Sequence, residues 1–361
     1  MKKIYNLLFA KKKILLFSPV LHVNDSISNS IIFQKKFFNK RGFNCAIITE
    51  QNFLETKDSI FQFSDYKINK NDIIIYHYAG MCDFFKKIYK LSNRMIIYYH
   101  NVTPAVYYKN YDQKIYTGLL EDDENFQSLV KKNENIISVS NFSKLKLMSM
   151  DFTNISVIPI LFDFVDYSKL SNCNNFTKNK NDIFLINVGR ILPHKNQFEL
   201  IKIFKKLTIE YPNHNYKLFF IGDVNLFHSY YNICLDYINA HGIKNIYFTG
   251  MLSNTERNYF YANADVYVST SLHEGFCMPM IESMNHNIPI VAYANAAIPE
   301  TLNNIETLVY DSSHSNFIKQ THKIITDINF KNKIISEQKL IFESLNSEKV
   351  GILWINAINK L

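Results

Sequence analysis

The chain has 361 residues, 47% of them hydrophobic and 15% aromatic, so it can build a large core and is not an intrinsically disordered protein. This length favours two domains over one. The formal net charge of +8 suits nucleic acid, an anionic membrane or an anionic substrate, and does not choose among them.

Five scattered cysteines without a Cys-x-x-Cys pair argue against a disulfide or zinc framework and favour a reducing, cytosolic setting. Lysines at positions 11–13 interrupt the apolar N-terminal stretch after about seven residues, which is too short for a secretion signal. No apolar run reaches the length of about 18 residues that a membrane span needs. We therefore expect a protein of the cytoplasm.

The first half alternates short apolar runs with amphipathic segments, a pattern typical of parallel strands connected by helices. The predicted strands cover residues 13–20, 45–49, 72–78, 95–99, 136–139 and 157–160, and the predicted helices cover 31–38, 84–91 and a segment starting at Ser140. The hydroxyl of Ser140 is expected to cap its helix.

Residues 161–182 lose this periodicity and become polar, which indicates a domain boundary. The alternation then resumes. The predicted strands are 183–188, 216–221, 246–249, 264–270, 289–292 and 307–309, and the predicted helices are 198–210, 227–240, 256–263, one opening near Pro279, and a helical tail at 317–361 with Trp354 on its apolar side. Two similar α/β halves place any ligand at the carboxyl ends of their strands.

The stretch 267–285 carries the strongest functional signal. Glu274 lies in a loop after a predicted strand, Glu282 lies in the helix that follows, and Pro279 suits the first turn of that helix. Unpaired N–H groups at a helix start favour an anion. Glu282 alone would be ordinary as an exposed acid, but its apolar neighbours at 280–281 indicate a buried carboxylate with a partner. The arrangement suits a ligand bearing both phosphates and hydroxyls.

A second signal opens the second half, where Gly189 and Arg190 follow a strand and Lys195 precedes a helix. Glycine lets the backbone approach a ligand, and the two basic side chains can grip a diphosphate. Taken alone, such basic residues are usually solvated, and glycines such as Gly222 and Gly250 at other strand ends usually form tight turns. The recurrence of glycine at equivalent strand ends favours a shared ligand site.

These motifs together resemble the retaining glycosyltransferases of family four. The matching segments of the second half are G-R-x4-K at 189–195, F-T-G at 248–250, E-G-F-x2-P-x3-E at 274–282 and A-x-P-E-T at 297–301. The segments N-D-S-I-S-N at 24–29, Y-H-N-V-T-P at 99–104, V-S-N-F-S at 139–143 and P-I-L-F-D-F at 159–164 look like a bacterial surface-polysaccharide subgroup.

The resemblance implies the α/β GT-B fold, in which two Rossmann-like domains face each other across a cleft. We expect an acceptor-side domain at 1–165, a linker at 166–182, a nucleotide-sugar domain at 183–335, and a C-terminal helix at 336–361 that packs back toward the first domain. The implied reaction is transfer of a hexose with retention from a nucleotide-diphosphate sugar to a glycan or lipid-linked glycan, in surface polysaccharide synthesis. GDP-mannose is the expected donor, with UDP-hexoses close behind.

The resemblance also assigns roles. The implied donor-binding residues are Gly189, Arg190 and Lys195 at the diphosphate, Met251 and Leu252 beside the base, Glu274, Gly275, Phe276 and Cys277 at the sugar, and Glu282 at the ribose. Glu274, Arg190, Lys195 and His100 are the implied catalytic set, and no cofactor or metal ion is expected.

Asp25, Asn29 and His100 are the implied acceptor-side residues. His100 would face the donor sugar and the acceptor, and its alternative is a hydrogen-bonded core histidine. The first loop lacks the glycine pair of many family members, so Asp25 either contacts the acceptor or caps a helix. A similar pair is replaced by alanines at 296–297.

Two other functions are open to such a chain. A GT-B sugar-nucleotide epimerase would need no acceptor, and a non-enzymatic binder of an anionic ligand would need no reaction. Nucleic acid is disfavoured because the basic residues form no aromatic-interleaved strip. The basic, aromatic segments at 35–41, 86–90 and 107–116 would suit peripheral attachment to an anionic inner leaflet, or are ordinary core-facing helices.

Overall fold

The computed structural model describes residues 13–23, 25–54, 60–80, 82–91, 94–162 and 176–361. The chain divides by its internal contacts into two units. The first comprises residues 1–104, 117–163 and 345–361, and the second comprises residues 105–116 and 164–344. Most of the predicted linker at 166–182 lies outside the described residues, and so does Cys173.

The first unit is built on an all-parallel sheet with the strand order β3-β2-β1-β4-β5-β6-β7. Its strands are β1 (Lys13–Leu21), β2 (Asn44–Asn52), β3 (Ile60–Gln62), β4 (Ile73–Tyr78), β5 (Arg94–Tyr99), β6 (Ile136–Ser138) and β7 (Ile155–Val157). Residues 14–17 and 73–78 are buried without alternation, as expected for central parallel strands covered on both faces.

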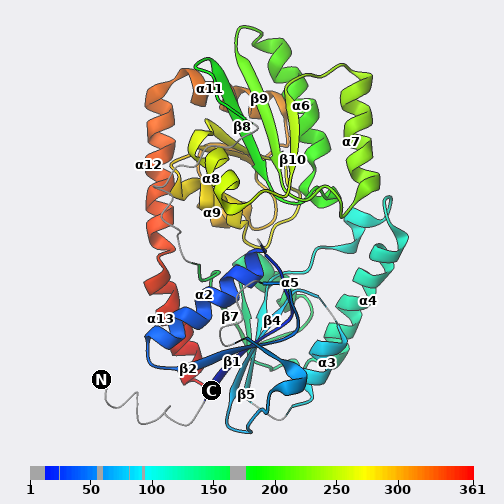
Figure 1. The fold of residues 1–361 in the computed structure, drawn as a ribbon, viewed down its shortest axis with the longest axis vertical. Coiled ribbons are helices and arrows are strands. Elements are labelled where there is room, and N and C mark those ends of the chain that lie inside the picture. The colour runs from blue at the N-terminus through cyan, green and yellow to red at the C-terminus, as the bar shows by residue number, and fades with distance from the viewer. Residues whose placement is uncertain (1–12, 24, 55–59, 81, 92–93, 163–175) are drawn as a thin grey trace. The chain divides into compact units, whose positions relative to one another are not determined.

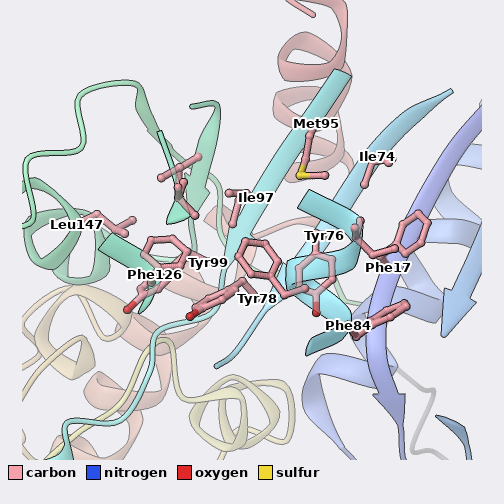
Figure 2. Close-up of a cluster of buried hydrophobic side chains, with 14 of the residues drawn as sticks. Phe17, Ile74, Tyr76, Tyr78, Phe84, Met95, Ile97, Tyr99, Phe126 and Leu147 are labelled. Atoms are coloured by element: carbon pink, nitrogen blue, oxygen red, sulfur yellow. The ribbon is translucent and has the colours of Figure 1, made fainter. Parts of the chain in front are cut away.

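The helices of this unit are α2 (Ser26–Lys40), α3 (Asp83–Tyr89), α4 (Gln113–Leu129, which begins within the 105–116 segment), α5 (Asn141–Met148) and α13 (Ser347–Asn359). A side chain caps α5 as predicted, since Ser140 Oγ accepts from the N–H of Ser143 at 3.2 Å. Figure 2 shows the core on one face of the sheet, where Tyr76 and Tyr78 of β4 pack with Phe84 and Phe126 from two helices.

The second unit is built on another all-parallel sheet, of order β10-β9-β8-β11-β12-β13. Its strands are β8 (Asp182–Val188), β9 (Asn215–Ile221), β10 (Ile246–Gly250), β11 (Val266–Ser269), β12 (Ile290–Tyr293) and β13 (Leu308–Val309). The helices are η3 (Pro193–Lys195), α6 (Gln197–Glu210), α7 (His228–Ala240), α8 (Asn254–Asn263), α9 (Met278–Asn285), α10 (Ile298–Thr301), α11 (His314–Thr326) and α12 (Ile328–Ser344), with η2 (Ala105–Tyr108) from the inserted segment. The predicted α/β class is confirmed in both units.

Three elements differ from the sequence predictions. The strand predicted at 157–160 lies at 155–157, because Pro159 has no N–H to donate to a ladder. Helix α4 was not predicted, since Phe126 is its only residue classed as buried and its apolar periodicity is weak. Its acidic run at 121–124 therefore belongs to a helix. Strand β3 was missed because its three residues are mostly exposed.

The C-terminal helix α13 packs in the first unit. The indole of Trp354 is fully buried and meets the ring of Tyr98 edge-on, with centroids 4.7 Å apart. Gly351 faces Phe37 of α2 so closely that an added Cβ would lie 1.9 Å from the ring, and the two helices lie side by side in Figure 1. The predicted boundary at 335/336 falls inside α12, and the division into units falls at 344/345.

Within the described residues, no helix combines the length and the apolar character needed to span a bilayer.

Replacing Trp354 by alanine is expected to lower the free energy of unfolding of the first unit by about 3–5 kcal/mol, because it opens a large cavity beside Tyr98. Leu353 of the same helix is 45% exposed, and Leu353→Ala is the matched control, with an expected loss below about 1 kcal/mol. Urea denaturation followed by far-ultraviolet circular dichroism, which does not depend on the tryptophan, measures the free energy of unfolding of both variants. Equal losses for the two variants would contradict the packing described for α13.

Candidate functional site

The strand ends of the second unit approach one another through glycines. The N–H of Gly189 donates to the carbonyl of Ile221 at 2.9 Å, and that of Gly222 donates to Gly250 at 3.1 Å. Gly222 has φ +150°, and a Cβ there would lie 2.3 Å from the carbonyl oxygen of Gly189. Only glycine permits this contact. The loops after β8, β9 and β10 are therefore stacked at the carboxyl ends of their strands, where α/β sheets bind ligands.

Lys195 and Glu274 meet at these strand ends. Lys195 ends the short helix η3 after β8, and Glu274 lies in the loop between β11 and α9. The ammonium donates to both carboxylate oxygens, at 2.7 and 2.8 Å. Glu274 is only 8% exposed, and a carboxylate this buried requires such a partner. Lys195, predicted to bind the phosphates, and Glu274, predicted to bind the sugar, thus form one ion pair.

Arg190 is exposed and takes no part in that pair. Its backbone carbonyl accepts a hydrogen bond from Nε2 of Gln197 at 3.0 Å, and this bond fixes the backbone of the loop. Burial raises the pKa of Tyr108, and the nearby guanidinium of Arg190 opposes that rise. The guanidinium of Arg190 is therefore close enough to Tyr108 to influence its pKa.

The predicted sugar loop leads directly into α9. Phe276 and Cys277 are buried, and Cys277 caps the helix in a left-handed conformation with φ +62°. The loop is braced by α10 and its N-cap, since Ala297 N–H donates to Glu274 O at 3.3 Å and Thr301 Oγ1 donates to Phe276 O at 2.8 Å.

Two further features of this loop bear on the sequence predictions. Gly275, between Glu274 and the buried pair, is half-buried. Ala296 has φ +53°, which L-residues disfavour, so the alanine that replaces a glycine of the family keeps the backbone geometry of a glycine.

Glu282 on α9 is held by a residue pair that the sequence did not reveal. The hydroxyl of Tyr261 donates to its Oε2 at 2.5 Å, and Arg257 lies 3.8 Å from its Oε1. Both partners lie on α8. Of the predicted base-side residues, Met251 is 63% exposed and Leu252 is half-buried. Glu282 is therefore a half-buried carboxylate with a fixed orientation, as its apolar neighbours indicated.

The first unit contains a cavity of about 250 Å³ at the carboxyl ends of β1 and β4. Its lining includes Asp25, Ile27, His77, Gly80 and Cys82. The carboxylate of Asp25 caps α2, because its Oδ2 accepts from the N–H and the hydroxyl of Ser28 at 2.8 and 2.9 Å. Asp25 thus has the capping role and also lines the cavity, whereas Asn29 is exposed on the first turn of α2.

His100 forms a chain of buried side chains with His77 and Gln34. Its Nε2 lies 3.0 Å from Nδ1 of His77, and Nε2 of His77 lies 3.0 Å from Oε1 of Gln34. Burial lowers the pKa of His100 to about 3, and burial together with His100 lowers the pKa of His77. Both rings are therefore neutral near pH 7. The buried Nδ1 of His100 has no hydrogen-bond partner among the described residues, so it is available to a ligand.

The second half of the chain is similar to a known family of proteins. Residues 170–340 match the family model described as glycosyl transferases group 1. An uncharacterized glycosyltransferase of Methanocaldococcus jannaschii is 28% identical over 218 residues, which cover 57% of this chain and 50% of the relative. The O-antigen chain mannosyltransferase RfbU of Salmonella typhimurium is 26% identical, over 59% of this chain and 56% of the relative. The matches thus span about half the length of these curated relatives.

The fold of the whole chain also has solved counterparts. Anabaena Alr3699/HepE, whose structure is described as a complex with UDP and glucose, superposes with a TM-score of 0.71. The superposition covers 97% of this chain and all of that one at 14% sequence identity, so it shows the shared fold alone.

The low pKa of His100 predicts a pH dependence of stability. Between pH 6.5 and pH 3 the unfolded chain binds a proton at this position that the folded chain does not, so the free energy of unfolding falls as the pH falls. At pH 5 the loss relative to neutral pH is on the order of 2 kcal/mol for this one histidine.

His100→Gln should remove this contribution, and His228→Gln, at an exposed position, is the control. Urea unfolding at pH 7 and pH 5 measures the difference. If the free energy of unfolding falls between pH 7 and pH 5 by the same amount in the wild type and in His100→Gln, His100 takes up its proton in the folded state and the prediction is wrong.

Proposed function

We propose that the protein transfers a sugar from a nucleotide-diphosphate donor to a hydroxyl of an acceptor, a proposal supported by the match of residues 170–340 to the family model described as glycosyl transferases group 1. The observation that carries the proposal is the buried pair of Lys195 and Glu274 at the carboxyl ends of the strands. In the unliganded site each group satisfies the other's charge. A donor brings both a diphosphate for the ammonium and sugar hydroxyls for the carboxylate.

The proposed reaction retains the configuration at the anomeric carbon. The bond from that carbon to the diphosphate oxygen breaks, and Lys195, Arg190 and the N–H groups at the start of α9 stabilise the charge of the leaving group. The acceptor oxygen attacks from the same face, and its proton passes to the departing phosphate oxygen. This route needs no strong protein base and no metal ion, because the cationic side chains supply the positive charge.

Each remaining side chain has a proposed role. Glu274 binds hydroxyls of the transferred sugar, and Glu282, oriented by Tyr261, binds the ribose hydroxyls. Met251 and Leu252 lie beside the base. The neutral ring of His100 suits a hydrogen bond to a sugar or acceptor hydroxyl through its unpaired Nδ1. Asp25 and Asn29 are proposed as acceptor contacts.

The proposed substrates are a hexose donor and a surface-glycan acceptor, either free or lipid-linked. The name of the Salmonella relative supports mannose and O-antigen synthesis, whereas the Anabaena structure with UDP and glucose supports a UDP-hexose. Peripheral attachment to the inner face of the cytoplasmic membrane is proposed from the exposed lysines at 36, 40, 87 and 90, because the aromatic residues Phe37 and Phe38 beside the first two are buried.

Lys195→Ala is expected to abolish most of the thermal stabilisation that GDP-mannose or a UDP-hexose gives the wild-type protein, because a ligand raises Tm only through binding to the folded state. The same change should lower kcat/KM by about 100-fold or more, as for other preorganised donors to a developing charge. Lys202→Ala, at a lysine of α6 that pairs with Glu199, is the control. A wild-type Tm unaffected by every nucleotide sugar would refute the proposed donor site.

Product analysis by proton NMR is expected to show the same anomeric configuration in the new linkage as in the donor. The donor incubated without acceptor should stay unchanged apart from slow hydrolysis. An inverted linkage would exclude the proposed mechanism. A new sugar nucleotide formed without acceptor would instead identify an epimerase.

A further inference from the structure

The segment 105–116 connects two parts of the first unit in sequence, yet its residues pack in the second unit. Three of its four tyrosines make distinct contacts there. Tyr111 packs its ring edge-on against Phe227 and Tyr230 of the second unit, with centroids 6.3 and 5.4 Å away. The hydroxyls of Tyr107 and Tyr108, in contrast, form hydrogen bonds with the loops of the candidate donor site.

Tyr108 is joined to the residue that precedes Lys195. Its hydroxyl lies 3.1 Å from Nδ1 of His194, and both side chains are more than nine-tenths buried. Burial, with the charge of Lys195 close by, lowers the pKa of His194, so the ring is neutral and its Nδ1 can accept from the phenol. The rotation of His194 is thereby fixed one residue before the lysine.

Tyr107 is joined to the loop that carries Glu274. Its hydroxyl donates to the carbonyl of Leu272 at 3.2 Å, and its ring lies 6.0 Å from that of His273, the residue before Glu274. The glutamate loop is also tied to the lysine loop, since Leu272 N–H donates to His194 O at 2.8 Å. One pair of adjacent tyrosines therefore fastens both loops.

We propose that Tyr107 and Tyr108 are positioning residues of the donor site, which hold the lysine loop at 193–195 and the glutamate loop at 271–274 in register for a nucleotide diphosphate. The reason is geometric, because the ammonium and the carboxylate come from different loops and small displacements of binding groups are costly. The proposal rests on the proposed function for its ligand, but the bracing of the loops is a property of the unliganded protein.

The test compares Tyr108→Phe and Tyr107→Phe with Tyr111→Phe. Each change removes one hydroxyl and keeps the ring, and within the described part of the chain the hydroxyl of Tyr111 makes no hydrogen bond. Hydrogen–deuterium exchange of peptides covering 190–197 and 270–276 is measured without ligand, and calorimetry measures the Kd for GDP and UDP. The two site variants should exchange faster in both loops and bind the preferred nucleotide about five- to tenfold more weakly, as expected for a lost buried hydrogen bond.

A double-mutant cycle with His194→Ala distinguishes positioning from general destabilisation. If Tyr108 acts through His194, Tyr108→Phe should add little in the His194→Ala background, although it weakens binding in the wild type. Additive losses, or exchange and affinity equal to those of Tyr111→Phe, would overturn the proposal. If the wild type binds neither nucleotide but the two tyrosine variants still show faster hydrogen–deuterium exchange in both loops, the loop bracing stands and the proposed donor fails.

Discussion

The ion pair of Lys195 and Glu274 is the constraint on which the second unit's functional architecture depends. A carboxylate that is 8% exposed is costly to bury, and the lysine offsets this only because two separate loops bring the charges within 2.8 Å. The glycines that stack the strand ends, the left-handed cap at Cys277 and the bond from Ala297 to Glu274 all serve to place these loops. In the unliganded protein the two charges proposed to bind the donor thus neutralise each other.

The first unit follows a different principle. Its buried histidine chain is uncharged, since burial keeps His77 and His100 neutral and Gln34 completes the chain between helix and strand. The pair of Lys195 and Glu274 is charged, whereas the histidine chain beside Asp25 is neutral, and this contrast supports the proposed division between a donor site and an acceptor side.

Much of the fold could be predicted from the sequence, because buried parallel strands appear as continuous apolar runs and nearly all of them were located. Helix α4 and strand β3 could not, since they bury too few residues to leave a periodic pattern. The donor-site residues were inferred from motifs, but their pairing was not, because Lys195 and Glu274 are far apart in sequence. Tyr108, His77 and Tyr261 left no local signal, as each acts through a partner that only the tertiary structure provides.

The return of α13 to the first unit has a consequence for how the chain is made. Tyr98 and Phe37 are synthesised before residues 164–344 of the second unit, whereas Trp354 and Gly351, which cover them, are synthesised after those residues. The first unit therefore cannot complete its core until translation has passed the second unit. Domains generally fold in order from the N-terminus. Here the first unit waits for a segment that follows the second unit, with an apolar surface uncovered in the meantime.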